Sequence, residues 1–164
     1  MAYEGDELTE CGAFLLDFKK IAVVAVSGSG PNVCGHLIIY TPAHGGYYFH
    51  VAGLYGVPRY MSAANFPRYL KENGKRELRR VNLVLPNPEG AAAYIEEALA
   101  TDWAWGVLPH NCVSFCEEVI KAGGGVWASY TNCPALATDV PQHVFGQFMN
   151  ELDSQIFRLY GVPR

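Results

Sequence analysis

The chain has 164 residues, of which half are hydrophobic and only 17% are charged, and its formal net charge is −4. This length predicts one domain spanning residues 1–164, and the apolar content excludes a disordered chain. The negative charge gives no support to nucleic-acid binding, which requires a basic surface. No apolar run approaches the length that spans a bilayer, so we expect no transmembrane segment.

The first residues, "MAYEGDELTECG", are acidic and lack the basic start and apolar run of a secretory signal peptide. We therefore expect synthesis in the cytoplasm. Work outside the cytoplasm would then require a route of secretion that does not depend on a signal peptide.

The first half of the chain predicts one helix followed by three strands. Apolar residues at helical spacing predict a helix over residues 7–19. The continuous apolar run in 20–28 predicts a buried strand. Two further strands are expected in 34–42 and 45–53, and the short link at 43–46 favours an antiparallel hairpin.

The second half predicts more helix, with one further strand. We expect a short helix over 61–73, a fourth strand over 79–86 and a helix over 87–102, with Asn87 as its cap and Pro88 at its first position. Another helix is expected from near Cys112 to the glycines at 123–125, then a loop at 126–141 and a final helix at 142–161. The pattern is that of an α+β domain with an antiparallel sheet of about four to five strands packed against helices.

Five cysteines, an odd number, stand in a chain without a secretory signal, which favours reduced thiols over a disulfide framework. Cys112 is the chemically suggestive one. If Asn111 caps the following helix, the helix dipole and unpaired N–H groups favour a thiolate at Cys112 and could also hold an oxyanion. The alternative is a small residue packed at the start of a core helix.

Two histidines lie on neighbouring predicted strands, where a base for the thiol could be held rigidly. In a tight hairpin His36 and His50 can share one face, so that His50 orients His36 as the third member of a triad does. Each histidine taken singly could instead be a core or edge residue. We expect His110, Asn111 and Tyr48 to line the substrate cleft.

A zinc site formed by His110, Cys112 and Cys116 is the competing interpretation. Their spacing lacks a second pair of ligands elsewhere, so we predict no metal. The segment "SGSGPN" lacks the lysine and helix of a phosphate-binding loop, and no cofactor is expected.

The order His36, His50, Cys112, with "GHLIIY" upstream and "HNCVSFCEEVI" downstream, resembles the circularly permuted papain-like hydrolases. This group includes NlpC-type peptidases, lecithin:retinol acyltransferase-like proteins and PPPDE proteins. The resemblance implies a permuted papain-like fold with Cys112 as nucleophile at a helix N-terminus, His36 as base and His50 as the group that steadies the base.

The sequence departs from the acyltransferase-like members in two ways. Val113 and Ser114 stand where those proteins have an acidic residue and a histidine, and no apolar C-terminal anchor follows. An amide or peptide substrate is therefore favoured, such as peptidoglycan cut by an antibacterial toxin with an inhibitory immunity partner. A lipid acyltransferase, phospholipase or thioesterase, and a non-catalytic binding module, remain as alternatives.

Overall fold

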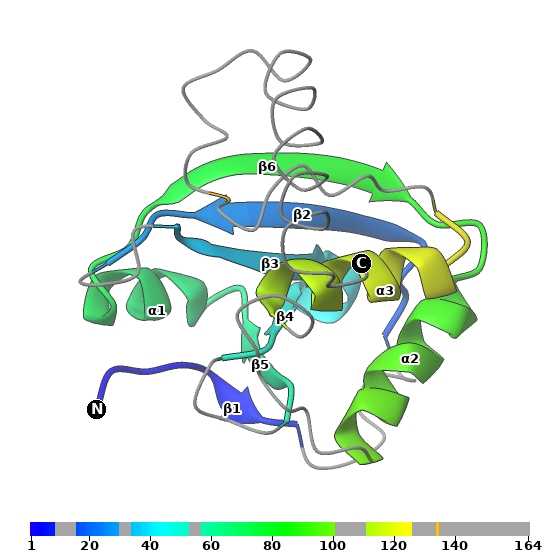
Figure 1. The fold of residues 1–164 in the computed structure, drawn as a ribbon, viewed down its shortest axis with the longest axis horizontal. Helices are drawn as coiled ribbons and strands as arrows, with labels where there is room; N and C mark the ends of the chain where they lie inside the picture. Colours follow the sequence, from blue (N-terminus) through cyan, green and yellow to red (C-terminus); the bar gives the residue numbers. More distant parts are fainter. Residues whose placement is uncertain (9–15, 30–33, 53–56, 101–110, 126–133, 135–164) are drawn as a thin grey trace, which may run out of the picture.

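The computed structural model describes residues 1–8, 16–29, 34–52, 57–100, 111–125 and 134, which form an α+β fold around one sheet (Figure 1). All five strand pairings are antiparallel, and the spatial order is β1-β5-β4-β3-β2-β6. The strands are β1 Asp6–Glu7, β2 Lys20–Val26, β3 His36–Thr41, β4 Tyr47–His50, β5 Arg59–Ser62 and β6 Glu77–Val84. The helices are α1 Phe66–Glu72, α2 Pro88–Ala100 and α3 Cys112–Ala122.

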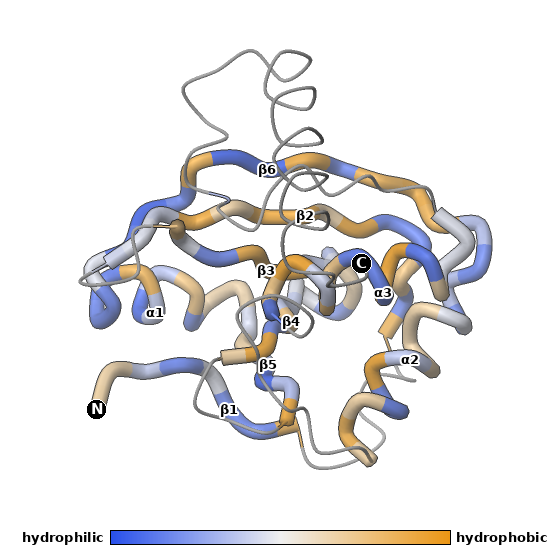
Figure 2. Tube along the Cα trace, in the orientation of Figure 1, coloured by the Kyte–Doolittle hydropathy of each residue, from blue (hydrophilic) through white to orange (hydrophobic). Residues whose placement is uncertain are grey.

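The neighbouring strands β2 and β3 are rich in apolar residues, as the hydropathy colouring of Figure 2 shows. Every residue of β2 after Lys20 is buried. Successive side chains point to opposite faces, so a run of branched aliphatic residues fills both layers at once. This placement accounts for the uninterrupted apolar stretch in the sequence.

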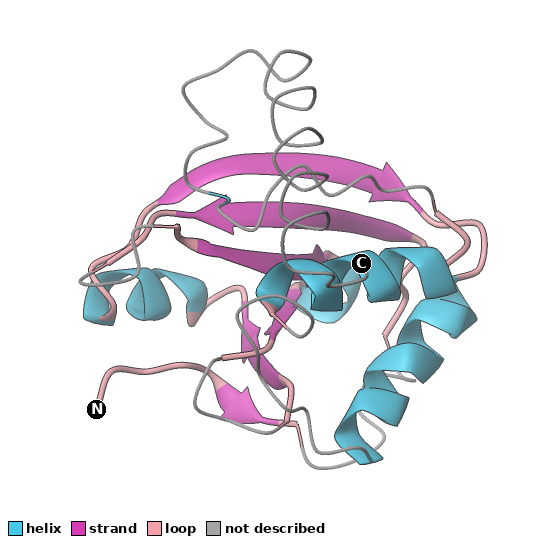
Figure 3. Cartoon of the chain, in the orientation of Figure 1, coloured by secondary structure: helices cyan, strands magenta, loops and turns pink. Residues whose placement is uncertain are grey.

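One face of the sheet is covered by α3, which packs on β3 and β4, and by α2, which packs on α3 (Figure 3). The core on this face joins alternate residues of β2 and β3 to the buried side of α3. Its largest members include Phe18, Ile39, Phe49, Phe115 and Ile120. Because α3 contributes six buried side chains, its N-terminal residue is held rigidly against the sheet.

The opposite face carries a second core beneath α1. Phe66 and Tyr69 of this helix pack with Val24, Ile38, Tyr48 and Met61. The ring of Tyr48 stacks on that of Phe66, with centroids 4.0 Å apart. This helix therefore shields the part of the sheet on which His50 lies, and the rings of His50 and Tyr69 are 5.6 Å apart.

The start of the predicted helix at residues 7–19 is wrong. Glu7 belongs to β1 and pairs with Arg59 of β5, so that sheet pairing overrides the local helical spacing. Leu16–Lys19 are not helical either, and residues 9–15 lie outside the described part of the chain. The sheet accordingly has six strands rather than four to five, since neither β1 nor β5 was predicted.

The other predicted elements that fall on described residues are present, with shifted bounds. The 34–42 and 45–53 strands form the β3–β4 hairpin, closed by a 3₁₀ turn at Ala43–Gly45. The predicted helix at 61–73 begins only at Phe66, because Met61 and Ser62 pair with β4. The predicted strand at 79–86 is β6, and the predicted helix at 87–102 is α2.

The loop predicted at 126–141 and the helix predicted at 142–161 lie outside the described residues, apart from Pro134. Within the described part of the chain, no helix has both the length and the apolar character needed to cross a bilayer.

Candidate functional site

Cys112 is the first residue of α3, and Asn111 caps the helix as predicted. The side-chain oxygen of Asn111 accepts hydrogen bonds from the backbone N–H groups of Val113 and Ser114, at 2.9 and 3.1 Å. The Ser114 hydroxyl accepts in turn from the N–H of Asn111 at 2.9 Å, which completes a capping box. Asn111 is 6% exposed, so its amide oxygen serves the helix rather than the surface of a cleft.

The thiol of Cys112 is nearly buried, with 9% of the residue exposed. Burial raises the pKa of this thiol, while the N–H groups of Leu37, Cys112 and Val113 and the ammonium of Lys75 act in the opposite direction. Burial dominates, so the resting group is a neutral thiol. The sequence-based expectation of a thiolate with a lowered pKa is wrong in this respect.

The two histidines are joined in a chain of hydrogen bonds that fixes both tautomers. Nε2 of His50 is 2.9 Å from the backbone oxygen of Glu4, and a carbonyl oxygen can only accept, so His50 carries its proton on Nε2. In neutral His50, Nδ1 is then an acceptor, and it lies 2.8 Å from Nε2 of His36. His36 must donate from Nε2, which leaves its Nδ1 with a free lone pair.

Both imidazoles are held neutral. Burial lowers the pKa of His36 well below its ordinary value, and the neighbouring His50 and Lys75 act in the same direction. Burial also lowers the pKa of His50 to about 4, against the opposing effect of its hydrogen bond to Glu4. His50 is fully buried, whereas His36 retains partial exposure. His36 is therefore the member of the pair that is partly open to solvent.

The Cys112 sulfur lies beside the strand position that follows His36. The backbone N–H of Leu37 is directed at this sulfur, which brings α3 and the start of β3 together at one end of the sheet. Among the described residues no hydrogen bond joins the Cys112 sulfur to the His36 ring.

Two further residues beside the site were not found from the sequence. Lys75 is half-buried, interacts electrostatically with Cys112 and both histidines, and donates from Nζ to the Ser27 oxygen at 3.4 Å. Glu4 acts through its backbone oxygen, for which a sequence carries no side-chain signal.

Tyr48, another predicted substrate contact, does not reach the site. Tyr48 is 5% exposed and packs in the core beneath α1, where its hydroxyl accepts from Arg80 at 2.7 Å. Tyr48 therefore packs in the core and does not line a cleft. His110 lies outside the described residues.

The expectation that the cysteines are reduced is wrong for Cys34, which is disulfide-bonded. Cys112 and Cys116 are free and buried. Cys116 lies one turn further along α3, is 0% exposed and packs in the core, and burial raises the pKa of its thiol well above the ordinary value. Within the described ranges, no group of three or more His, Cys, Asp or Glu side chains could hold a metal ion.

No protein-family model matches this chain, and comparisons with curated proteins and with solved structures found no match.

Proposed function

We propose that the protein is a cysteine hydrolase that cleaves an amide or peptide bond through a thioester on Cys112. One observation carries the proposal: the hydrogen-bonded chain Glu4–His50–His36 leaves an unprotonated Nδ1 on His36, the residue before Leu37, whose backbone N–H is directed at the Cys112 sulfur. A general base requires an unprotonated nitrogen of this kind, and we propose that it serves the thiol of Cys112.

The first half of the reaction forms the thioester. His36 takes the thiol proton on Nδ1 as the sulfur attacks the carbonyl carbon, and the C–S bond forms while the carbonyl becomes an oxyanion. In this proposal the N–H of Cys112, at the start of α3, stabilises this charge, since helix N-termini favour anions. The C–N bond then breaks, and the leaving amine receives the proton from His36.

The second half regenerates the enzyme. Water attacks the thioester carbon and gives a proton to Nδ1 of His36, the C–S bond breaks, and the proton returns to the sulfur as the acid leaves. Throughout these steps, Nε2 of His36 keeps its hydrogen bond to His50. His50 thus orients the base and stabilises the imidazolium that forms transiently.

The substrate class we propose is a peptide amide of the bacterial cell wall, cut by a secreted toxin whose producer holds an inhibitory immunity partner. The disulfide at Cys34 supports work in an oxidising compartment, because such bonds form and persist there and are rare in the cytosol. Expression of the chain directed to the periplasm should stop growth, whereas expression in the cytoplasm should not. The variant Cys112→Ala should remove the periplasmic effect.

The direct test is turnover with trapping of the intermediate. Purified peptidoglycan and peptide amides would be incubated with wild type, Cys112→Ala and Cys116→Ala, and new amino groups would be counted. We expect the loss of at least a hundredfold in Cys112→Ala and little change in Cys116→Ala, since proton transfer and oxyanion stabilisation each contribute factors of about that size. Hydroxylamine should divert the thioester to a hydroxamate. Full turnover by Cys112→Ala would end the proposal.

A non-catalytic binding module is the competing reading, favoured by the low exposure of Cys112 and its neutral thiol. A packed cysteine would show both properties. The same assay separates the two, because a binding module would release no amines and would form no hydroxamate in wild type or in either variant.

A further inference from the structure

We propose that the N-terminal segment Tyr3–Glu7 is a positioning element of the catalytic site, clamped by β5 and α1 so that the Glu4 carbonyl fixes the tautomer of His50. This proposal rests on the proposed function for its consequence in turnover. Its structural content can be tested without substrate.

The first set of contacts that holds the segment comes from β5. Arg59 donates to the backbone oxygen of Gly5 from both Nη2 and Nε, at 2.6 and 3.1 Å, so that a charged fork holds the peptide unit next to Glu4. Gly5 itself has φ of +85°, and a Cβ there would stand 2.6 Å from the Tyr60 oxygen. The segment therefore lies closer to β5 than any residue other than glycine allows.

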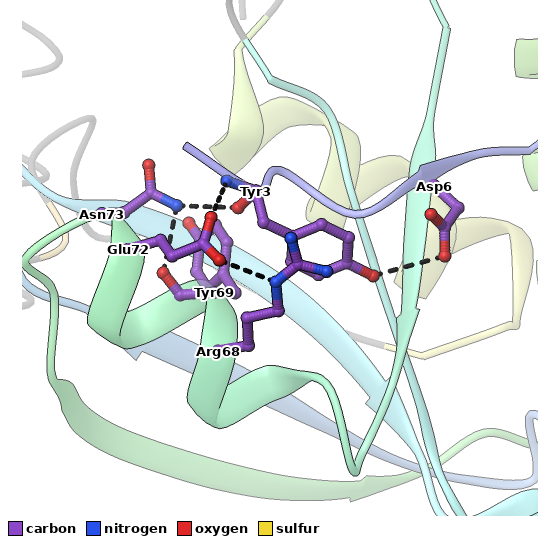
Figure 4. Close-up of polar contacts among 6 residues, drawn as sticks. All are labelled: Tyr3, Asp6, Arg68, Tyr69, Glu72 and Asn73. Carbon is purple, nitrogen blue, oxygen red and sulfur yellow. Dashed lines mark hydrogen bonds and ion pairs between the residues drawn. The ribbon is translucent and has the colours of Figure 1, made fainter. Parts of the chain in front are cut away.

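The second set of contacts comes from the C-terminal end of α1 (Figure 4). Glu72 accepts from the N–H of Tyr3 at 2.8 Å, and Asn73 donates to the Tyr3 oxygen at 2.8 Å, so both backbone groups of Tyr3 are held. Arg68 pairs with Glu72 at 2.7 Å, and its guanidinium lies 4.3 Å from the centre of the Tyr3 ring. These contacts hold the backbone of Tyr3 in one position against α1.

The position that these contacts fix is that of the Glu4 oxygen. This oxygen accepts the Nε2 proton of His50, whose ring is otherwise enclosed beneath α1. If the segment moves away, the proton of His50 can shift to Nδ1, which then faces Nε2 of His36 as a donor. His36 would have to reverse its own tautomer, and its Nδ1 would no longer be free to accept the proton of Cys112.

The test is the tautomer of His36 and His50, read from long-range ¹⁵N–¹H NMR of the full-length chain without substrate. Wild type should show both rings protonated on Nε2. Arg59→Met removes both hydrogen bonds to the Gly5 oxygen, and Arg59→Lys keeps one charged donor. Glu72→Ala removes the acceptor for the N–H of Tyr3. A matched control is Glu118→Ala, which breaks an exposed ion pair with Lys121 on α3.

We expect the ratio of Nε2–H to Nδ1–H tautomer of His50 to fall about tenfold in Arg59→Met and about threefold in Glu72→Ala, with recovery in Arg59→Lys and no change in Glu118→Ala. On an amide that wild type cleaves, kcat should fall by similar factors with KM unchanged. Unchanged tautomers in Glu72→Ala and in folded Arg59→Met overturn the proposal. If Arg59→Met does not fold, Glu72→Ala decides. Altered tautomers in a protein that cleaves no amide would leave this proposal standing and end the proposed function instead.

Discussion

Buried neutral His50 should make the protein lose stability as the pH falls below neutrality. Burial lowers the pKa of His50 to about 4 from the 6.5 of an exposed histidine. Between these two values the unfolded chain binds a proton on His50 that the folded chain does not, so the free energy of unfolding falls as the pH falls. Stability from this group is complete above about pH 6.5 and declines through the window down to about pH 4.

The size of the loss follows from the same two pKa values. A single group with this shift lowers the free energy of unfolding by about 2 kcal/mol between about pH 7 and about pH 5. The matched variant is His50→Gln, whose amide can donate to the Glu4 oxygen and accept from His36 but does not titrate. We expect the pH-dependent loss in His50→Gln to be smaller than in wild type by about 2 kcal/mol.

The assay is urea unfolding followed by circular dichroism at the two pH values. The control is His44→Asn, at an exposed turn position with φ of +50° that asparagine tolerates, and it should keep the wild-type loss. An equal loss of stability in wild type and His50→Gln would refute the reasoning, because His50 would then not gain a proton on unfolding.

Three further predictions follow from the described contacts. The pKa of His36 is lowered by burial, so a pH–rate profile should show kcat/KM level around neutral pH and falling only well below pH 6.5. A fall in kcat/KM that begins at or above pH 6.5 would contradict the assignment of His36 as the base. Asn111→Ala should lower the free energy of unfolding by about 1 kcal/mol in urea titrations. Asn65→Ala, at an α1 cap whose side chain makes no capping hydrogen bond, should cost less, and equal costs would contradict the role of the capping box. Gly5 and Gly45 both have a positive φ, but only at Gly5 would an added Cβ stand 2.6 Å from a backbone oxygen. Thermal unfolding should therefore show that Gly5→Ala lowers the free energy of unfolding by more than about 1 kcal/mol and by more than Gly45→Ala does.

Features governed by local rules could be predicted from the sequence. Asn87 and Pro88 predicted α2, and Asn111 predicted the start of α3, because capping depends on residues within about one helical turn. The β3–β4 hairpin was equally predictable, since its two apolar runs are separated by a short glycine-containing link.

Features that depend on distant contacts could not be predicted. Glu7 carries a helical pattern but is held in a strand by Arg59, which is far away in the sequence. The contribution of Glu4 to the site is a carbonyl oxygen that every residue has. Burial against the sheet raises the pKa of the Cys112 thiol by more than the N–H groups at the helix N-terminus lower it. The sequence reveals the helix N-terminus but not the burial.

The most direct measurement of the central claim, that His36 serves Cys112 as a base, is the rate of alkylation of each free cysteine. Wild type and His36→Gln would be treated with chloroacetamide at neutral pH, and peptides carrying Cys112 and Cys116 would be quantified by mass spectrometry, with Cys116 as the internal reference for a packed thiol. We predict that Cys112 reacts at least about tenfold faster than Cys116 in wild type and loses that advantage in His36→Gln. Equal slow labelling of both cysteines, unaffected by His36→Gln, would contradict the account.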